Sequence, residues 1–334
     1  MVEAGQVVVT THLGADADED WASRIHGRRL RSAAMLTDEK ILITGPAGQI
    51  AEPLTRYLAG DNEVWGIARF GDAEARARVE GYGVTTRVIN LGDGEYGDLP
   101  TDFTYVLHLA ADQSGGYDYD NALRVNAEGT GLLLQHCRTA KAALVMSTFS
   151  TYRPKDDPTQ PYVETDPLGD ANSMHAPTYS MSKIGQEAVA RYAARSLGLP
   201  VTIARMNASY GDNGGLPGNH LAAALAGTPV ITRWDPCVYS PIHEDDICAQ
   251  TEALLAAATV PATVVNWAGD EPVSVQQWCA LMAEELGRPV EVKVGDFPNT
   301  QRSAISDNTK RLSFTGPCTV PWQEGIRRMV KARS

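Results

Sequence analysis

The sequence predicts an α/β protein built on a doubly wound parallel sheet, with a smaller C-terminal region that binds a substrate. Two observations predict this fold. From Lys40 onward, short apolar runs alternate with stretches of helical periodicity, as expected when helices cover both faces of a parallel sheet. A glycine-containing turn follows the first apolar run, at the place where doubly wound sheets bind phosphate groups.

Six apolar runs have the length and composition of buried strands. They are Ile41–Thr44, Val64–Ala68, Thr85–Leu91, Tyr105–Leu109, Ala143–Ser147 and Val201–Met206. Apolar residues recur at helical spacing from Ile50, over residues 119–139 and over Tyr179–Ser196, so we expect helices there. Right-handed crossovers would join these elements into one sheet.

The turn after the first strand reads Thr44-Gly45-Pro46-Ala47-Gly48-Gln49-Ile50-Ala51. Small residues at positions 45, 48 and 51 allow a tight turn and a close approach of a pyrophosphate to the start of the next helix. Free N–H groups and the helix dipole favour an anion at that point. The strand–turn–helix setting therefore predicts dinucleotide binding by a Rossmann-type sheet.

Beyond Tyr210-Gly211 the chain changes to Gly- and Pro-rich loops. We expect helices at about 245–257 and 273–286, a strand at Thr263–Trp267 and a short basic helix at the end. The expected parts are a leader of unknown role at residues 1–39, a dinucleotide-binding Rossmann domain at 40–211, and a mainly substrate-binding region at 212–334. Some elements of this last region are expected to return to the Rossmann core.

Composition and charge exclude several classes of protein. Hydrophobic residues make up 43% of the chain and charged residues 21%, as in ordinary globular proteins. The net charge of −12 argues against a nucleic-acid partner. No apolar run approaches the roughly 18 residues that span a bilayer, and no secretory signal is found. The five cysteines are dispersed, which predicts reduced thiols, a cytoplasmic protein and no zinc site.

Tyr179 and Lys183 are four residues apart in the second long helix, which places the phenol and the ammonium on the same face. A phenol has an ordinary pKa of about 10, and a fixed cation beside it would lower that pKa toward neutral pH. The stretch Ser147–Tyr152 ends the fifth predicted strand, at the sheet edge where ligands bind. A hydroxyl there can hold a substrate oxygen against the tyrosine.

The order of these motifs resembles one family, the extended short-chain dehydrogenases/reductases, which are NAD-dependent epimerase/dehydratase-like proteins. The resemblance runs from about Lys40 to at least Asp246. It rests on Gly45-x-x-Gly48-x-x-Ala51, His108-Leu109-Ala110-Ala111, Asn126–Thr130, Ser147–Tyr152, Pro161–Glu164, Tyr179…Lys183, Tyr210-Gly211 and Ile242–Asp246.

The resemblance implies a role for each catalytic candidate. Tyr179 would be the general acid/base, and Lys183 would bind the nicotinamide ribose and tune Tyr179. Thr148 falls where the family places its catalytic Ser or Thr, with Ser147 as the neighbouring alternative. Asn126 would organise the cofactor side of the site.

The glycine turn, the strand ends and the Tyr–Lys pair together give the expected cofactor-binding residues. They are Gly45, Ala47, Gly48, Gln49, Ile50, Arg69, Asn90, Leu91, Leu109, Ala110, Ala111, Met146, Ser147, Tyr179 and Lys183. Arg69 ends the second strand, and no carboxylate precedes Asp72. An arginine at this place suits the extra phosphate of NADP, so NADP is the expected cofactor and NAD the second choice.

His243 and Asp245-Asp246 also suggest a metal site. We prefer the interpretation in which no metal binds and Asp245 caps the Ala/Leu-rich helix that follows.

Three functions fit these residues. The leading one is an oxidoreductase that transfers a hydride between the nicotinamide and a small-molecule carbonyl or secondary alcohol. The first alternative is a nucleotide-sugar epimerase or dehydratase with tightly bound NAD. The second is a non-catalytic dinucleotide sensor, which could dispense with Thr148, Tyr179 and Lys183. A homodimer is possible through the two long helices, where Leu132–Leu134 would supply apolar surface.

The nucleotide-sugar alternative lacks two residues that many such enzymes carry. Many of them have Arg-x-x-Asn-x-x-Gly after the sixth strand, and the asparagine contacts the diphosphate. Here Ala208 occupies that place and Asn207 is displaced by one residue. These enzymes also tend to have an arginine shortly before the Ile-His motif, where this chain reads Tyr239-Ser240-Pro241.

The leader gives a first prediction. A chain that begins at Met35 is expected to fold and to melt at the same temperature as the full chain, because the first predicted strand starts only at about Ile41. Thermal melts of both chains followed by circular dichroism test this. A clearly lower melting temperature for the shortened chain would show that residues 1–34 pack on the domain.

Overall fold

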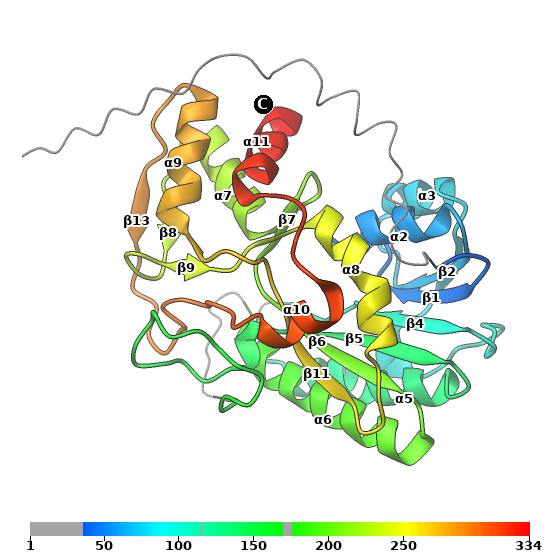
Figure 1. The fold of residues 1–334 in the computed structure, drawn as a ribbon. Coiled ribbons are helices and arrows are strands. Elements are labelled where there is room, and N and C mark those ends of the chain that lie inside the picture. The colour runs from blue at the N-terminus through cyan, green and yellow to red at the C-terminus, as the bar shows by residue number, and fades with distance from the viewer. Residues whose placement is uncertain (1–35, 115, 170–175) are drawn as a thin grey trace, which may run out of the picture. The chain divides into compact units, whose positions relative to one another are not determined.

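The computed structural model describes residues 36–114, 116–169 and 176–334 (Figure 1). Residues 1–35 of the predicted leader therefore lie outside the described residues. Within the described ranges no helix is long and apolar enough to cross a membrane.

A seven-stranded sheet forms the core, and all of its strands are parallel, which confirms the predicted fold class. Its order is β11-β6-β5-β4-β1-β2-β3, so the chain starts in the middle of the sheet and winds outward to both sides. The strands are β1 (Lys40–Thr44), β2 (Glu63–Ala68), β3 (Thr85–Val88), β4 (Tyr105–His108), β5 (Ala142–Thr148), β6 (Val201–Met206) and β11 (Thr263–Trp267). The winding direction changes between β1 and β4, and such a switch point opens a crevice at the carboxyl ends of the strands.

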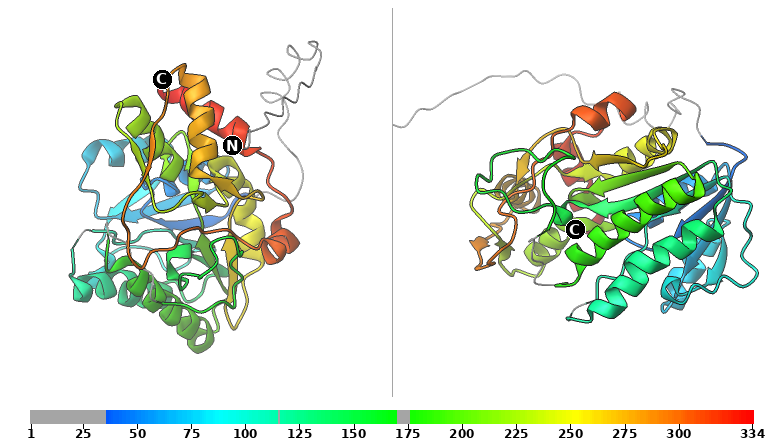
Figure 2. Two further views of the ribbon diagram at one scale, coloured as in Figure 1. Left: turned by 90° about the vertical axis from the view of Figure 1, so that its left-hand side faces the viewer. Right: turned by 90° about the horizontal axis from the view of Figure 1, so that it is seen from below.

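Helices cover both faces of this sheet (Figure 2). They are α2 (Ala51–Ala59), α3 (Ala73–Gly81) and α8 (Glu244–Ala256) on one face, and α5 (Gly129–His136) and α6 (Tyr179–Leu197) on the other. Ile41 and Ile43 pack toward the first group and Leu42 toward the second, because successive side chains of a strand point to opposite faces. The apolar runs of the sequence are continuous because both faces are buried.

The helix predicted at residues 119–139 has three parts. It consists of α4 (Tyr119–Leu123), a π-helical segment (Arg124–Glu128) and α5. Within it, Leu133 and Leu134 are fully buried in the core. Of the three leucines considered for a dimer contact, only Leu132 is exposed, so most of the apolar surface expected for that contact is used inside the molecule.

The structure corrects the end of the third strand and the cap of one helix. The third strand ends at Val88 instead of Leu91, because Asn90 accepts a hydrogen bond from the Gly92 N–H and starts a 3-10 turn at Leu91–Asp93. Helix α8 is capped by His243 and not by Asp245. The His243 Nδ1 atom accepts the Asp245 N–H at 3.1 Å, which leaves the Asp245 carboxylate inside the first turn, paired with Arg328.

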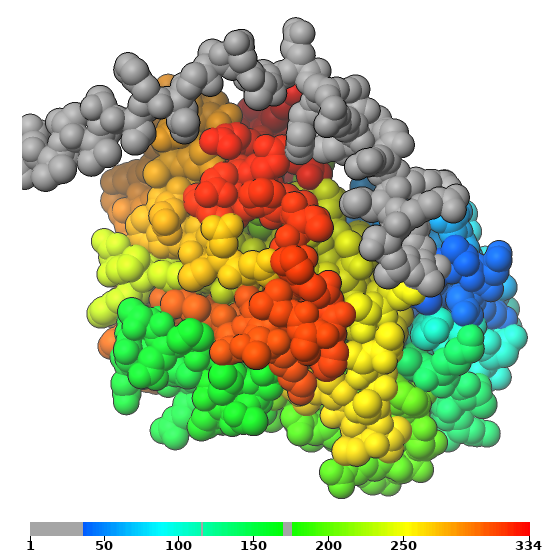
Figure 3. All heavy atoms as spheres, in the orientation of Figure 1, coloured from blue at the N-terminus to red at the C-terminus, as the bar shows by residue number. Residues whose placement is uncertain are grey.

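The C-terminal part forms a second layer of short elements around its own apolar cluster. These are β7 (Ser209–Gly211), α7 (Gly215–Leu225), β8 (Val230–Thr232), β9 (Val238–Tyr239), β10 (Ile242–His243), β12 (Val273–Ser274), α9 (Val275–Leu286), β13 (Val292–Val294) and α11 (Trp322–Arg333). Strand β11 and helix α8 belong to the central sheet and its cover, and α10 (Thr309–Thr315) packs against both (Figure 3). The division of the chain into functional domains stays a prediction.

Candidate active site

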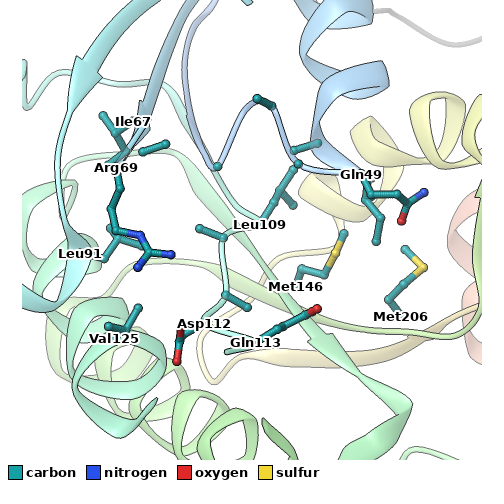
Figure 4. Close-up of a pocket in the computed structure, with 18 of the residues that line it drawn as sticks. Gln49, Ile67, Arg69, Leu91, Leu109, Asp112, Gln113, Val125, Met146 and Met206 are labelled. Atoms are coloured by element: carbon teal, nitrogen blue, oxygen red, sulfur yellow. The ribbon is translucent and has the colours of Figure 1, made fainter. Parts of the chain in front are cut away.

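A cavity of about 650 Å³ runs along the carboxyl edge of the sheet (Figure 4). Every residue expected to bind the cofactor lines it. These are Gly45, Ala47, Gly48, Gln49, Ile50, Arg69, Asn90, Leu91, Leu109, Ala110, Ala111, Met146, Ser147, Tyr179 and Lys183. Thr148 lines it as well, so three of the four catalytic candidates share one space with the glycine turn. The role of each residue stays a prediction.

The glycine turn is shaped for a close ligand. Gly45 has a φ of +65°, a left-handed conformation that favours glycine, and a Cβ there would lie 3.2 Å from the Ala110 Cβ. A Cβ on Gly48 would lie 3.1 Å from the Gly45 carbonyl oxygen. Both glycines therefore keep the wall of the cavity free of side chains at the start of α2, which fits a pyrophosphate held by backbone N–H groups.

A buried hydrogen-bond chain holds the loop that follows β4. The Thr44 hydroxyl oxygen accepts the N–H groups of Leu109 and Ala110 at 3.0 and 2.9 Å, so its own proton is donated to His108 Nδ1 at 2.9 Å. His108 Nε2 then carries the proton and donates to the Thr130 hydroxyl at 2.6 Å. Burial lowers the pKa of His108 to about 3, so the ring stays neutral and this direction of hydrogen bonding is maintained.

Arg69 and Asp72 lie at the far end of the cavity, after β2. The Arg69 side chain is drawn at this end in Figure 4, and among the described residues it has no hydrogen bond or ion pair. Asp72 caps α3, since its Oδ1 accepts the N–H groups of Glu74 and Ala75 at 2.9 and 3.3 Å. The Asn90 amide bonds to Asp93 and Gly92 within its own turn.

Asn126 does not line the cavity. It is buried in the π-helical segment, where its Oδ1 accepts the Asp112 N–H at 2.6 Å and its Nδ2 donates to the Asp112 carbonyl at 3.0 Å and to the Ser182 hydroxyl at 2.9 Å. The side chain therefore ties the loop after β4 to helix α6 beside Lys183. The role predicted for Asn126, to organise the cofactor side of the site, stays a prediction.

Tyr179 stands at the first turn of α6 and is half-buried. Burial raises the pKa of Tyr179 above its ordinary value, and the nearby polar side chains of Gln113 and Thr148 oppose this rise. The sequence led us to expect that Lys183 would lower this pKa. In the structure the Lys183 Nζ donates instead to the Met146 carbonyl at 2.6 Å, and the expected lowering is not seen.

Lys183 is fully buried, and burial lowers the pKa of its ammonium to about 7. The Glu187 carboxylate, one helical turn further on, opposes this lowering. Ser147, the alternative to Thr148, donates its hydroxyl to Glu187 at 2.6 Å. Thr148, unlike Ser147, is one of the side chains that lower the pKa of Tyr179.

Several lining residues escaped the sequence analysis, among them Asp112, Gln113, Val125, Met206 and Ser209. The Gln113 side chain is close enough to the Tyr179 phenol to lower its pKa. Its position just after the His108–Ala111 motif could have drawn attention to it, but side-chain direction in a loop does not follow from spacing. Across the described ranges, no group of three or more His, Cys, Asp or Glu side chains is placed to hold a metal ion.

The fold and the site define a class of protein. Its members have a parallel Rossmann-type sheet, with a glycine turn suited to a phosphate at one end of the crevice and a Tyr–Lys pair at the other. The family model of the NAD dependent epimerase/dehydratase family matches residues 41–233. The chain belongs to this family, as the motif order predicted. No curated protein matches the sequence.

Solved structures share the fold at low sequence identity. A structure of UDP-glucuronic acid 4-epimerase from Bacillus cereus with UDP-glucuronic acid and NAD is 20% identical, with a TM-score of 0.76 over 88% of this chain and 98% of that one. UDP-N-acetylglucosamine 4-epimerase from Methanobrevibacter ruminantium M1 is 19% identical, with a TM-score of 0.76 over 89% and 98%. An NAD dependent NDP-hexosamine 5,6-dehydratase of tunicamycin biosynthesis is 25% identical, with a TM-score of 0.70 over 88% and 97%.

Proposed function

We propose that this protein is an NAD(P)-dependent oxidoreductase that acts at the carbon of a secondary alcohol or carbonyl in a small molecule. The observation that carries this proposal is the single cavity that contains both the glycine turn and the Thr148–Tyr179–Lys183 group. A dinucleotide held at Gly45 and Gly48 would extend along this cavity toward Tyr179. When bound, the nicotinamide supplies the hydride acceptor or donor.

The chain's own residues would handle the proton. The Tyr179 phenol gives its proton to a substrate carbonyl oxygen, or in the reverse direction its phenolate takes the proton of a substrate hydroxyl, while the Thr148 hydroxyl holds the same oxygen. Because burial raises the pKa of the phenol, Tyr179 rests in its protonated form and is suited to donate first. Lys183, whose Nζ lies 6.0 Å from the centre of the Tyr179 ring, has a pKa of about 7 and can change its charge at neutral pH.

NADP remains the cofactor that we propose, on the strength of Arg69. A guanidinium that has no partner among the described residues, at the end of the cavity beyond β2, suits a phosphate, to which it can form charge-assisted hydrogen bonds. The family description and the neighbouring structures name NAD. If NAD is the cofactor, Asp72 can accept ribose hydroxyls, although its Oδ1 already serves as a helix cap.

A second candidate is a nucleotide-sugar epimerase or dehydratase, and the similarity to the solved structures favours it. The local geometry argues against diphosphate binding. The Asn207 Nδ2 donates to the Ala304 carbonyl at 2.7 Å, and its Oδ1 accepts the N–H groups of Ala208 and Ser240. The Ser240 hydroxyl is buried and accepts the Ser306 N–H. The displaced Asn207, which lines the cavity, and Ser240 thus both have their side chains engaged by the protein's own backbone.

Replacement of Tyr179 by Phe tests the proton step. Turnover should fall by about 10²–10⁴-fold while the melting temperature and dinucleotide affinity stay near those of the wild type, because only the phenolic oxygen is lost. A substrate is first found by following reduced nicotinamide absorbance with secondary alcohols and ketones. Tyr192→Phe, on the exposed face of the same helix, is the matched control. Near wild-type turnover of Tyr179→Phe would contradict the assignment of the proton step to Tyr179.

Replacement of Arg69 by Ala tests the cofactor. Loss of a charge-assisted contact of about 1.5–3 kcal/mol should weaken NADPH binding by about tenfold or more and leave NADH binding nearly unchanged. Isothermal titration with both dinucleotides measures this, with the exposed Arg138→Ala as control. Equal losses of affinity for both dinucleotides would contradict NADP as the cofactor. A wild-type protein that prefers NADH, and whose affinity for NADH falls in Asp72→Asn, would establish NAD instead.

Native mass spectrometry separates the two candidate functions. Because both diphosphate contacts are missing, the purified protein is expected to show no adduct with millimolar UDP-glucose and to exchange its dinucleotide freely. An epimerase must keep its NAD through each cycle. Stoichiometric retained NAD together with a UDP-sugar adduct would favour the nucleotide-sugar enzyme.

A further inference from the structure

A buried ion pair lies directly behind the catalytic candidates. The side chains of Glu187 on α6 and Arg205 on β6 are only 2% and 1% exposed. Arg205 Nε donates to Glu187 Oε1 at 2.8 Å, and its Nη2 donates to Oε2 at 2.7 Å. The two parallel hydrogen bonds fix both side chains in one orientation.

The pair also holds strand β5. The Ser147 hydroxyl donates to Glu187 Oε1 at 2.6 Å, and Ser147 lies opposite Arg205 in the pairing of β5 with β6. The residues on either side of Ser147 both serve the site. The Met146 carbonyl accepts a hydrogen bond from Lys183, and Thr148 lines the cavity together with Tyr179 and lowers the pKa of its phenol.

Arg205 also contacts the segment that follows Thr148. Its guanidinium stacks on the Tyr152 ring at 4.6 Å, and its Nη1 donates to the Glu164 carbonyl at 3.0 Å. Tyr152 ends the short 3-10 turn that begins directly after Thr148. The chain is therefore held on both sides of Thr148: Ser147 before it contacts Glu187, and Tyr152 after it contacts Arg205.

A buried ion pair is weak support for stability, because removing two charges from water offsets much of their attraction. Its geometric effect here is specific. We propose that Glu187 is a positioning residue: together with Arg205 it fixes the carboxyl end of β5, so that Met146 and Thr148 hold Lys183 and Tyr179 in place. This inference rests on the proposed function, since it concerns the same site.

The position of Glu187 has an electrostatic consequence that can be measured. The charged and titratable groups around Lys183 are Tyr179 and Glu187 on α6, neutral His108 on β4, and Arg205 on β6 behind the carboxylate. Burial lowers the pKa of Lys183 to about 7, and the charge of Glu187 opposes this lowering. Without that charge Lys183 loses its proton at a lower pH, so any contact made by its ammonium is lost at a lower pH as well.

The test uses the full chain and the fluorescence of NADPH, or of NADH if it binds more tightly, titrated between pH 5.5 and 9. In the wild type the Kd is expected to rise as the pH passes about 7. In Glu187→Gln this rise should begin about 1 pH unit lower, and turnover should fall about 10–100-fold through the loosened site. Arg191→Ala is the matched control, because Arg191 reaches the same carboxylate from the exposed side at 3.7 Å.

A further variant separates positioning from stability. Glu187→Gln leaves the buried charge of Arg205 without a compensating negative charge and is expected to lower the melting temperature. The double variant Glu187→Gln, Arg205→Met should recover the melting temperature without recovering wild-type binding or its pH dependence. The inference is overturned if the double variant regains wild-type binding and its pH dependence, or if Glu187→Gln binds the dinucleotide like the wild type. A wild-type protein that binds neither dinucleotide would instead overturn the proposed function.

Discussion

All seven strands of the central sheet run in one direction, and this constraint organises the rest of the molecule. Because the strands are parallel, every segment that leaves a carboxyl end does so at the same edge. The turn after β1, the arginine after β2, the loop after β4 and the hydroxyls at the end of β5 are thereby gathered around one cavity. Residues separated by more than a hundred positions in the sequence share this space, as Gly45 and Tyr179 do.

The loops at the carboxyl ends of the strands must also be held in shape, since they lack the backbone hydrogen bonds that join neighbouring strands. Two buried polar systems do this. On one side Thr44 and His108 hold the backbone of Leu109 and Ala110, and a lowered pKa keeps the imidazole neutral. On the other side Glu187 and Arg205 hold the end of β5 through Ser147. The cavity walls are therefore fixed by hydrogen bonds that local sequence patterns do not reveal.

Patterns with a fixed period predicted most of the fold. The apolar runs placed all strands of the sheet, and a glycine turn between strand and helix located the cofactor end of the crevice. Spacing also put Tyr179 and Lys183 on one helix face. Tertiary contacts decided what spacing could not: Lys183 turns to the Met146 carbonyl, Gln113 reaches the Tyr179 phenol, and His243 replaces Asp245 as a helix cap. Each of these depends on a partner that is distant in sequence or on a loop conformation.

The central claim is that the glycine turn and the Tyr179–Lys183 group form one dinucleotide site. Hydrogen–deuterium exchange followed by mass spectrometry tests it most directly, because it needs no substrate. On addition of NADPH or NADH, peptides that cover Gly45–Glu52, Leu109–Gln113 and the first turns of α6 should all become protected together. Protection at the glycine turn alone, or at none of these segments, would contradict the account.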